Sequence, residues 1–403
     1  MSEYLYIAKS FQGQTEEGKL EAKNERDLAM FLKEKGLILI SAKQVKQTQK
    51  RKFSLPFFNK VPLTQKLMMT RNLEVMITAG ISLTKCLKTL ASQTKSKTFK
   101  IALNQIEEKV LKGESFSSAL QQYPKIFSNL YCSMIKVGEQ TGGMDKSLEV
   151  LAFHLDRTHK LRSRIKGALM YPIVVVGAMI LIGAVMLIKV VPQLSMALAS
   201  LNAELPKLTK IVMGLGGFFA QRWYILLFAL LVIAGLFLFI KRKEKGKRVL
   251  AKIVLKIPFV SGLIKKINTA YTARTLGSLI SGGVAIVEAL EIAADSLNNY
   301  FYTKSLKYTA QQVKKGKKIS ESMAEFSNLY SPLFVQMLQV GEETGRTSEI
   351  LGKLADFLEE EVTNTTQNLS AIIEPILLLV IGGVIAFFAV AMMQPMYSMM
   401  SSL

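Results

Sequence analysis

The sequence predicts an all-α polytopic membrane protein with two duplicated six-helix cytoplasmic bundles, three transmembrane helices and a small α/β appendage at the N-terminus. Composition is the first reason: 50% of the 403 residues are hydrophobic and the mean hydropathy is +0.27, which is high for a soluble chain of this length. An internal duplication is the second reason. The stretch VGEQTG, from Val137 to Gly142, returns as VGEETG from Val340 to Gly345.

The two copies keep one constant spacing. Subtracting 138 from 341 gives 203, and this offset relates further glycines, prolines, arginines and leucines: Gly80 and Gly283, Gly113 and Gly316, Pro172 and Pro375, Pro192 and Pro395, Arg71 and Arg274, and Leu73 and Leu276. An ungapped offset held by glycines and prolines at positions that break helices indicates two copies of one supersecondary unit.

Residues 1–44 have a different pattern and are interpreted as the α/β appendage. We expect a strand over Tyr4–Ala8, turn positions at Gly13 and Gly18, a helix over Glu25–Lys35, and a second strand over Leu37–Ile40 after Gly36 as helix stop. Met1–Lys19 lacks a basic region followed by an apolar core, so no cleavable signal peptide is expected and the chain should start in the cytoplasm.

Residues 45–62 form a basic linker that also contains Pro56-Phe57-Phe58. Two interpretations stay open for it. It is either a solvated connection, or a basic and aromatic segment that rests on an anionic membrane surface or on a partner.

The first helical repeat is expected over residues 63–170 and the second over 266–371, after a basic linker at 241–265. Apolar residues recur at helical spacing between breaks at Gly80, Gly113 and Gly142. After Gly143 the pattern has no breaker until Gly167, so one helix should continue toward the membrane. Six helices with short connections are expected in each repeat.

Three apolar runs are long enough to cross a hydrocarbon core of roughly 30 Å, namely residues 171–191, 223–240 and 372–393. Residues 192–222 would be a periplasmic loop with an interfacial helix near 211–220, for which a fourth span is the alternative. Basic residues precede the first span and follow the second, which places both flanks in the cytoplasm by the positive-inside rule. The tail, 394–403, would then be periplasmic.

The repeated Gly-Glu-x-Thr-Gly motif lies where one helix stops and the next begins. Gly142 and Gly345 suit a left-handed position after a helix, and Thr141 or Thr344 can bond a free backbone group. A tight helical hairpin explains each residue type except the repeated glutamate. Glu139 and Glu342 are therefore candidates for partner contacts or for ion pairs with a basic side chain inside the bundle. Gly138 and Gly341 complete the two candidate motifs.

No catalytic, cofactor or metal site is predicted. A phosphate-binding loop, G-x-x-x-x-G-K-[ST], has no match. His154 and His159 are the only histidines and lie about 140° out of phase on a helix, so they do not form a metal pair. Asp356, Glu359, Glu360 and Glu361 could bind a hard cation, although a solvated helical face is the preferred interpretation. Cys86 and Cys132 are expected to be reduced packing residues.

A set of short motifs spread over nearly the whole chain points to a known family. They are Gly18, Glu21-Ala22, Gly36, Thr70–Leu73, Ala79–Leu83, Leu130-Tyr131, Gly138–Gly142, Lys166–Pro172, Val190–Pro192 and Leu205-Pro206. In these motifs the chain resembles the PilC/GspF family of inner-membrane platform proteins in type IV pilus and type II secretion machines. The resemblance implies a non-enzymatic platform, usually a homo-oligomer in the bacterial inner membrane. It would couple a separate hexameric cytoplasmic ATPase to insertion or extraction of pilin or pseudopilin subunits, alongside other inner-membrane components of the machine.

The function expected first is thus a type IV pilus platform, with a type II secretion or competence platform as the alternative. A transporter or channel is disfavoured, because the spans contain only Lys189 and Glu374 as ionisable residues, each near an edge. The net charge of +22 also raises nucleic-acid binding, but the basic residues gather beside the apolar runs, which favours an anionic membrane surface.

Overall fold

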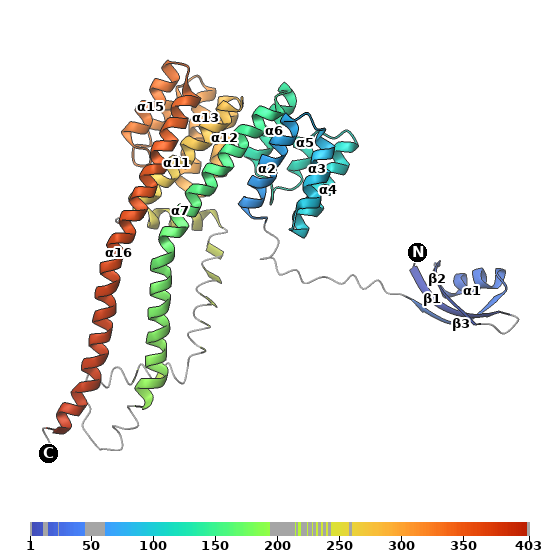
Figure 1. Cartoon of the computed structure of the whole chain (residues 1–403), viewed down its shortest axis with the longest axis horizontal. Helices are drawn as coiled ribbons and strands as arrows, with labels where there is room; N and C mark the ends of the chain where they lie inside the picture. The colour runs from blue at the N-terminus through green and yellow to red at the C-terminus, as the bar shows by residue number, and fades with distance from the viewer. Residues whose placement is uncertain are drawn as a thin grey trace. The chain divides into compact units, whose positions relative to one another are not determined.

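The structure is a computed structural model that describes residues 2–10, 15–22, 24–44, 61–193, 243–257 and 260–400, with scattered positions between 214 and 240. The chain divides into two compact units, Met1–Lys60 and Val61–Leu403. Figure 1 shows the elements of each unit, which are described separately here.

The N-terminal unit is a three-stranded antiparallel sheet with one helix. Its strands are β1 (Ser2–Ser10), β2 (Thr15–Ala22) and β3 (Leu37–Gln44), in the order β2-β1-β3, and its helix is α1 (Glu25–Glu34). Asn24 caps α1 by accepting a hydrogen bond from the backbone of Asp27. Leu28 and Leu32 of α1 are fully buried with Tyr4 and Ala8 of β1, so one helix face covers one face of the sheet.

The predicted turn at Gly18 is wrong, because Gly18 lies inside β2, opposite Tyr6 of β1. A Cβ built on Gly18 would lie 2.7 Å from the Tyr6 hydroxyl oxygen. The glycine therefore makes room for a tyrosine side chain that crosses the neighbouring strand. Sequence reasoning took this glycine as a strand boundary and missed β2.

The second unit contains the duplicated helices. The first copy consists of α2 (Leu63–Thr78), α3 (Leu83–Gln93), α4 (Lys97–Leu111), α5 (Phe116–Gln121), α6 (Asn129–Thr141) and α7 (Met144–Val185). The second copy consists of α11 (Val260–Ser281), α12 (Ile286–Ser296), α13 (Tyr300–Lys314), α14 (Ile319–Ala324), α15 (Pro332–Glu343) and α16 (Thr347–Met400). Helix α10 (Glu244–Val254) precedes α11 and lies in the segment expected to be a linker.

The helix bounds reproduce the offset of 203. Adding it to the bounds of α3, α4 and α5 gives the bounds of α12, α13 and α14 without a residue of difference. The turns also agree, since Gly80 and Gly283 have φ of +78° and +85°, and each glycine and the residue after it donate the same pattern of backbone hydrogen bonds to carbonyls of the preceding helix. The predicted equivalence of the two copies is confirmed at these helices and turns. The other three pairs differ at one end: α11 begins earlier than α2 does, α15 ends one residue earlier than α6 does, and α16 continues further than α7 does.

One hydrophobic core runs through both copies. Its buried residues come from positions between Val61 and Leu358 and form one cluster, which includes the fully buried Leu73 of α2 and Leu279 of α11. The copies meet where α6 packs on the turn between α11 and α12. A Cβ built on Gly282 would lie 2.9 Å from Met134 Cε, and one built on Gly283 would lie 3.3 Å from Val137 Cγ1.

Three aromatic rings occupy equivalent positions in the two cores, but the hydroxyl groups differ. Phe99, Phe127 and Tyr131 pack together in the first copy, and Tyr302, Tyr330 and Phe334 do so in the second. The Tyr131 hydroxyl contacts Thr70 Oγ1 at 3.1 Å, and the Tyr330 hydroxyl contacts Ser305 Oγ at 2.9 Å. The equivalents of these partners, Ala273 and Ala102, have no hydroxyl, and the equivalents of the two tyrosines are Phe334 and Phe127. The hydroxyls of Tyr131 and Tyr330 thus each occur in the copy that also supplies a hydroxyl partner.

Among the described residues, two helices are long and apolar enough to cross a membrane, over Met144–Gln193 and Thr347–Val390. The first includes the predicted span 171–191, and the second covers residues 372–390 of the predicted span 372–393, whereas the predicted span 223–240 falls largely outside the described residues. In the first, α7 is followed directly by a π-helical turn, η1 (Met186–Val190). Figure 1 shows α7 and α16 side by side and running in the same direction.

The prolines do not break these helices, contrary to the sequence expectation. Pro172 lies inside α7 and Pro375 and Pro395 lie inside α16, while Pro192 lies in the helical residues after η1. A proline removes one hydrogen bond and bends a helix, but flanking turns in an apolar segment can continue around it. The bundle and the apolar segment are therefore parts of one helix in each copy.

Candidate functional site

The two repeated motifs end α6 and α15 in the same way. Gly142 and Gly345 have φ of +73° and +69°, the left-handed conformation predicted for them. Thr141 Oγ1 donates to the Val137 carbonyl at 2.8 Å, and Thr344 Oγ1 donates to the Val340 carbonyl at 2.7 Å. The glycine prediction is confirmed, whereas each threonine bonds a carbonyl one turn back in its own helix, and in the second motif the Thr344 backbone N–H also donates to that carbonyl, so it is not a free group.

The first glycine of each motif lets two helices approach closely. A Cβ built on Gly138 would lie 2.8 Å from Ser147 Oγ and 3.1 Å from Met144 Cα. At Gly341 the nearest atom would be Thr347 Cα, also at 3.1 Å. A side chain at either position would push α7 away from α6, or α16 away from α15, and thus move the long helices relative to the bundles.

Glu139 caps a different helix from the one that carries it. Its carboxylate accepts hydrogen bonds from the backbone N–H groups of Phe116 and Ser117, at 2.5 and 3.0 Å, and from the Ser117 hydroxyl at 2.5 Å. These N–H groups open α5 and have no partner within that helix. Ser115 receives a bond from the next one, Ser118.

Glu342 makes the same contacts in the second copy. It accepts from the backbone N–H groups of Ile319 and Ser320 at 2.6 and 2.9 Å, and from the Ser320 hydroxyl. The residue before α14 is Lys318, whose side chain makes no capping bond, so Glu342 replaces the usual N-cap. A carboxylate at the positive end of a helix is also favourable electrostatically.

The proposed ion pairs of Glu139 and Glu342 with a basic side chain are therefore wrong, because their partners are backbone N–H groups and serine hydroxyls. A glutamate can cap a helix some 22 residues earlier only where the chain folds back, and single-sequence spacing carries no sign of that. A role for either motif in partner contacts stays a prediction.

Arg71 and Arg274 are equivalent in sequence but differ in burial. Arg71 Nη2 lies 3.2 Å from Asp156 Oδ1, and its side chain is 51% exposed. Arg274 Nε lies 2.7 Å from Glu359 Oε1, and its side chain is only 4% exposed. Asp156 and Glu359 are themselves 203 residues apart, so the ion pair is repeated along with the helices.

Arg274 is the centre of a charged cluster where α7, α11 and α16 meet. Its Nη2 also lies 2.6 Å from Asp356 Oδ1, which in turn lies 3.3 Å from Arg157 Nη2 of α7. The Phe153 ring contacts both guanidinium groups, since its centroid lies 5.0 Å from Arg157 Cζ and 5.5 Å from Arg274 Cζ. Burial alone would lower the pKa of Arg274, but the bonds to Glu359 and Asp356 raise it above its ordinary value.

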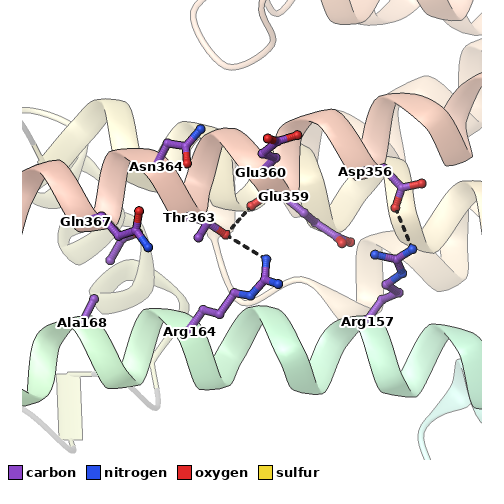
Figure 2. A pocket seen from close by; sticks show the side chains of 10 residues that line it. Arg157, Arg164, Ala168, Asp356, Glu359, Glu360, Thr363, Asn364 and Gln367 are labelled. Atoms are coloured by element: carbon purple, nitrogen blue, oxygen red, sulfur yellow. Dashed lines mark hydrogen bonds and ion pairs between the residues drawn. The ribbon is translucent and has the colours of Figure 1, made fainter.

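A polar groove of about 910 Å³ continues from this cluster along α7 and α16 (Figure 2). Arg164 Nη1 donates to Thr363 Oγ1 at 3.3 Å across it, beyond the pair of Arg157 and Asp356. The groove ends at Ala168 and Gln367, a few residues before the predicted spans begin. The acidic face of α16 is thus matched to basic residues of α7, rather than solvated throughout as expected from the sequence.

The same acidic residues offer no site for a cation. Asp356 and Glu359 bind Arg274, and Glu361 lies 3.4 Å from Lys266 Nζ. Within the described residues no group of three or more histidine, cysteine or acidic side chains is arranged to hold a metal ion. The repeated pairs Arg71 with Asp156 and Arg274 with Glu359 could have indicated this arrangement from the sequence.

His154 is buried between the copies, where its Nδ1 lies 3.2 Å from Ser278 Oγ of α11. Burial, together with the charges of Arg274 and Arg162, lowers the pKa of His154 to about 4. It is therefore neutral at physiological pH and connects α7 to α11 by one polar contact.

The sequence matches the family described as "Type II secretion system (T2SS), protein F" over residues 69–192 and again over 272–395, and its N-terminal domain over residues 1–43. The two matched segments are themselves 203 residues apart. The chain belongs to this family. Its repeats, with the Glu139 and Glu342 caps and the long helices α7 and α16, are thus the two T2SSF domains of one protein.

Curated relatives carry two kinds of name. "Type IV pilus assembly protein PilC" of Myxococcus xanthus is 32% identical over 99% of this chain and 95% of its own length. The protein of the same name from Thermus thermophilus is 30% identical over 100% and 99%. "Type II secretion system protein F" of Vibrio cholerae is 27% identical over 99% and 98%. The T2SSF family therefore includes proteins of pilus assembly and of secretion, and both kinds align with the whole chain.

Proposed function

We propose that this protein is the inner-membrane platform of a type IV pilus assembly machine. In that role it couples a separate cytoplasmic ATPase to the insertion or extraction of pilin subunits. The observation that carries the proposal is the match to the family over both repeats and the N-terminal unit, in one register. The relatives named for pilus or fimbrial assembly are 28–32% identical, compared with 26–28% for the secretion proteins, which favours a pilus over the alternative of a type II secretion or competence platform.

The arrangement of the long helices supports a platform role. Each of α7 and α16 begins in a packed helical body and continues into an apolar segment of spanning length. A load applied to the body would therefore reach the membrane without crossing a loop. The energy would come from the partner, since the sequence has no phosphate-binding loop.

The membrane topology proposed with this function has three spans. The N-terminus and two six-helix bundles would lie in the cytoplasm, while residues 192–222 and the tail after 393 would be periplasmic. Single cysteines at Ser200 and Lys245 provide the test, because Cys86 and Cys132 are buried and should label slowly. A membrane-impermeant maleimide should label Ser200→Cys in intact spheroplasts, and Lys245→Cys only after lysis. The reverse pattern would contradict the topology.

The test of function is deletion of the gene, with complementation by the wild-type chain. We expect surface pili, sheared and counted by electron microscopy, to be lost and then restored. Crosslinking in cells should capture the assembly ATPase and pilin with the wild-type protein. Unchanged piliation with loss of a secreted substrate would instead assign the chain to secretion.

A further inference from the structure

The two repeats contact each other through unlike faces. The first repeat presents α6 and α7, and the second presents α11, α12 and α16. Val137 of α6 lies against Gly283, and His154 of α7 contacts Ser278 of α11. In such a head-to-tail contact the two repeats use different faces. Each used face has a counterpart on the other repeat, and these two counterpart faces take no part in the contact between the repeats. They are called the open faces below.

The open faces are found by shifting each internal contact by 203 residues. Val137 becomes Val340 and Gly283 becomes Gly80, while His154 becomes Phe357 and Ser278 becomes Val75. Val340, Phe357 and Val75 are 44%, 47% and 66% exposed, although all three are large and apolar. A Cβ built on Gly80 would have no atom within 4 Å, so this turn is uncovered where its counterpart is covered.

The chemistry of the open faces is matched in the same way as the internal contact. Inside the chain, the polar His154 meets the polar Ser278. At the shifted positions both residues are apolar, Phe357 and Val75, so the two sides have changed together. Met68, the counterpart of Tyr271, is another apolar residue on this face of α2 and is 63% exposed. Exposed apolar residues gathered on matching faces mark an interface.

One charged pair completes the comparison. Phe153 contacts Arg274 inside the chain, and their shifted counterparts are Asp356 and Arg71. These two side chains have opposite charge and are 49% and 51% exposed, so each can accept another partner besides those it has within the chain. The open faces are thus complementary in charge as well as in apolar surface.

We propose that a second copy of this chain docks here, with α15 and α16 of one copy on α2 and the Gly80 turn of the next, in the geometry of the internal repeat contact. The inference deepens the proposed platform by naming its self-association surface. Because α7 and α16 run in the same direction, repeating the internal operation keeps all apolar helices in one membrane. Whether the ring closes after two copies or more depends on the rotation between repeats.

Disulfide trapping in membranes tests the contact directly. The variant Val75→Cys with Phe357→Cys, in the full chain, should give covalent dimers or higher species under mild oxidation. A matched control pairs Phe357→Cys with Ile101→Cys, whose side chain is 58% exposed on α4, away from the predicted interface. It should remain monomeric on a non-reducing gel. A crosslinked product containing a different protein would overturn self-association at this face.

Charge substitution gives a second test that does not depend on trapping. Val75→Glu and Phe357→Lys are both exposed, so each variant should fold, but each buries an unpaired charge in the interface. We expect each to weaken self-association by at least about tenfold, which corresponds to about 1.4 kcal/mol. The double variant should recover most of this loss, because the new charges face each other, while Ile101→Glu should have no effect.

Native mass spectrometry of the detergent-solubilised protein measures these changes. Equal oligomer populations in all four variants, or a double variant no better than the singles, would overturn the interface. The platform proposal is tested separately by piliation after gene deletion. A chain that supports pili but never yields the Val75–Phe357 crosslink would disprove this interface alone.

Discussion

Arg274 and Glu359 form a buried ion pair, 2.7 Å apart, that repeats the pair of Asp156 and the half-exposed Arg71 in the other copy. The same two helix positions thus carry the same charges in different surroundings. In the second copy the long helix of the first, α7, covers the pair through Phe153 and Arg157. Duplication supplied the pair, and the packing of one copy on the other buried it.

The two arginines should therefore differ in their contribution to stability. Arg274→Gln leaves Asp356 and Glu359 without their shared buried partner and is expected to cost about 3–5 kcal/mol. Arg71→Gln removes a half-exposed arginine and leaves Asp156 paired with Lys160, so it should cost less than about 1 kcal/mol. Thermal unfolding of the full-length protein in detergent, followed by circular dichroism, measures both. Equal losses would show that burial does not govern this pair.

The glutamate caps predict an unequal effect of the same substitution. Glu139→Gln should destabilise modestly, since Ser115 still caps α5. Glu342→Gln should cost more, on the order of 1–2 kcal/mol, because Lys318 offers no side-chain cap to α14. Glu343→Gln, at the exposed neighbouring position, is the control and should change stability by less than about 0.5 kcal/mol. Protection of the α14 amides from hydrogen exchange reports the loss locally, and unchanged protection would refute the capping role.

Two glycines on neighbouring helices should respond in opposite directions to alanine. Gly138→Ala places a methyl group 2.8 Å from Ser147 Oγ and should destabilise by about 1–3 kcal/mol. Gly167→Ala lies in α7 with nothing within 4 Å and should stabilise by about 0.5–1 kcal/mol. Midpoints of thermal unfolding give the sign of each. A shift in the same direction for both would contradict the close approach of α6 and α7.

The paired hydroxyls of Tyr131 and Thr70 allow a double-mutant cycle. Thr70→Ala leaves the buried Tyr131 hydroxyl without its partner and should cost about 1–3 kcal/mol. Adding Tyr131→Phe recreates the Ala273 and Phe334 pair of the other copy and should recover part of this loss. Additive effects in chemical denaturation would mean that the two hydroxyls do not interact.

Acid should weaken the contact between the copies through His154. Its pKa of about 4 lies below the ordinary value near 6.5, so the unfolded chain binds a proton first as the pH falls. Stability from this group is complete above about pH 6.5 and decreases toward pH 4 by up to about 1.4 kcal/mol per unit. The difference between the wild-type chain and His154→Gln, measured by thermal unfolding from pH 7.5 to 4.5, isolates this effect from the carboxylates. A difference that does not vary with pH would disprove it.

The sequence predicted what depends on local backbone conformation and periodicity. Gly80, Gly142 and their counterparts require a left-handed backbone, and their constant offset located the turns of both copies. The long helix after Gly143 was also predicted, since nothing interrupts its pattern before the apolar run. Such features need no knowledge of which residues meet in space.

The wrong predictions concern contacts between residues that are distant in sequence, or prolines that a helix accommodates. For Glu139 a partner contact and an ion pair were the alternatives, and helix capping was missed because its partners, the first N–H groups of α5, lie near it only after folding. Gly18 was taken as a turn because the space it leaves for Tyr6 depends on strand register. Pro172 and Pro375 were taken as helix breaks, yet the apolar helices continue through them.

The unbroken course of α7 has a mechanical consequence. A helix without an intervening loop resists twisting, so a turn of the helical body about the axis of α7 rotates its apolar side chains by nearly the same angle. Pro172 lacks the N–H that would complete the helical hydrogen bonds at the entry to the apolar segment, so bending of α7 costs least there. Rotation of the helical body would thus be passed on to the apolar helices, and any bending at Pro172 would turn part of it into sideways motion.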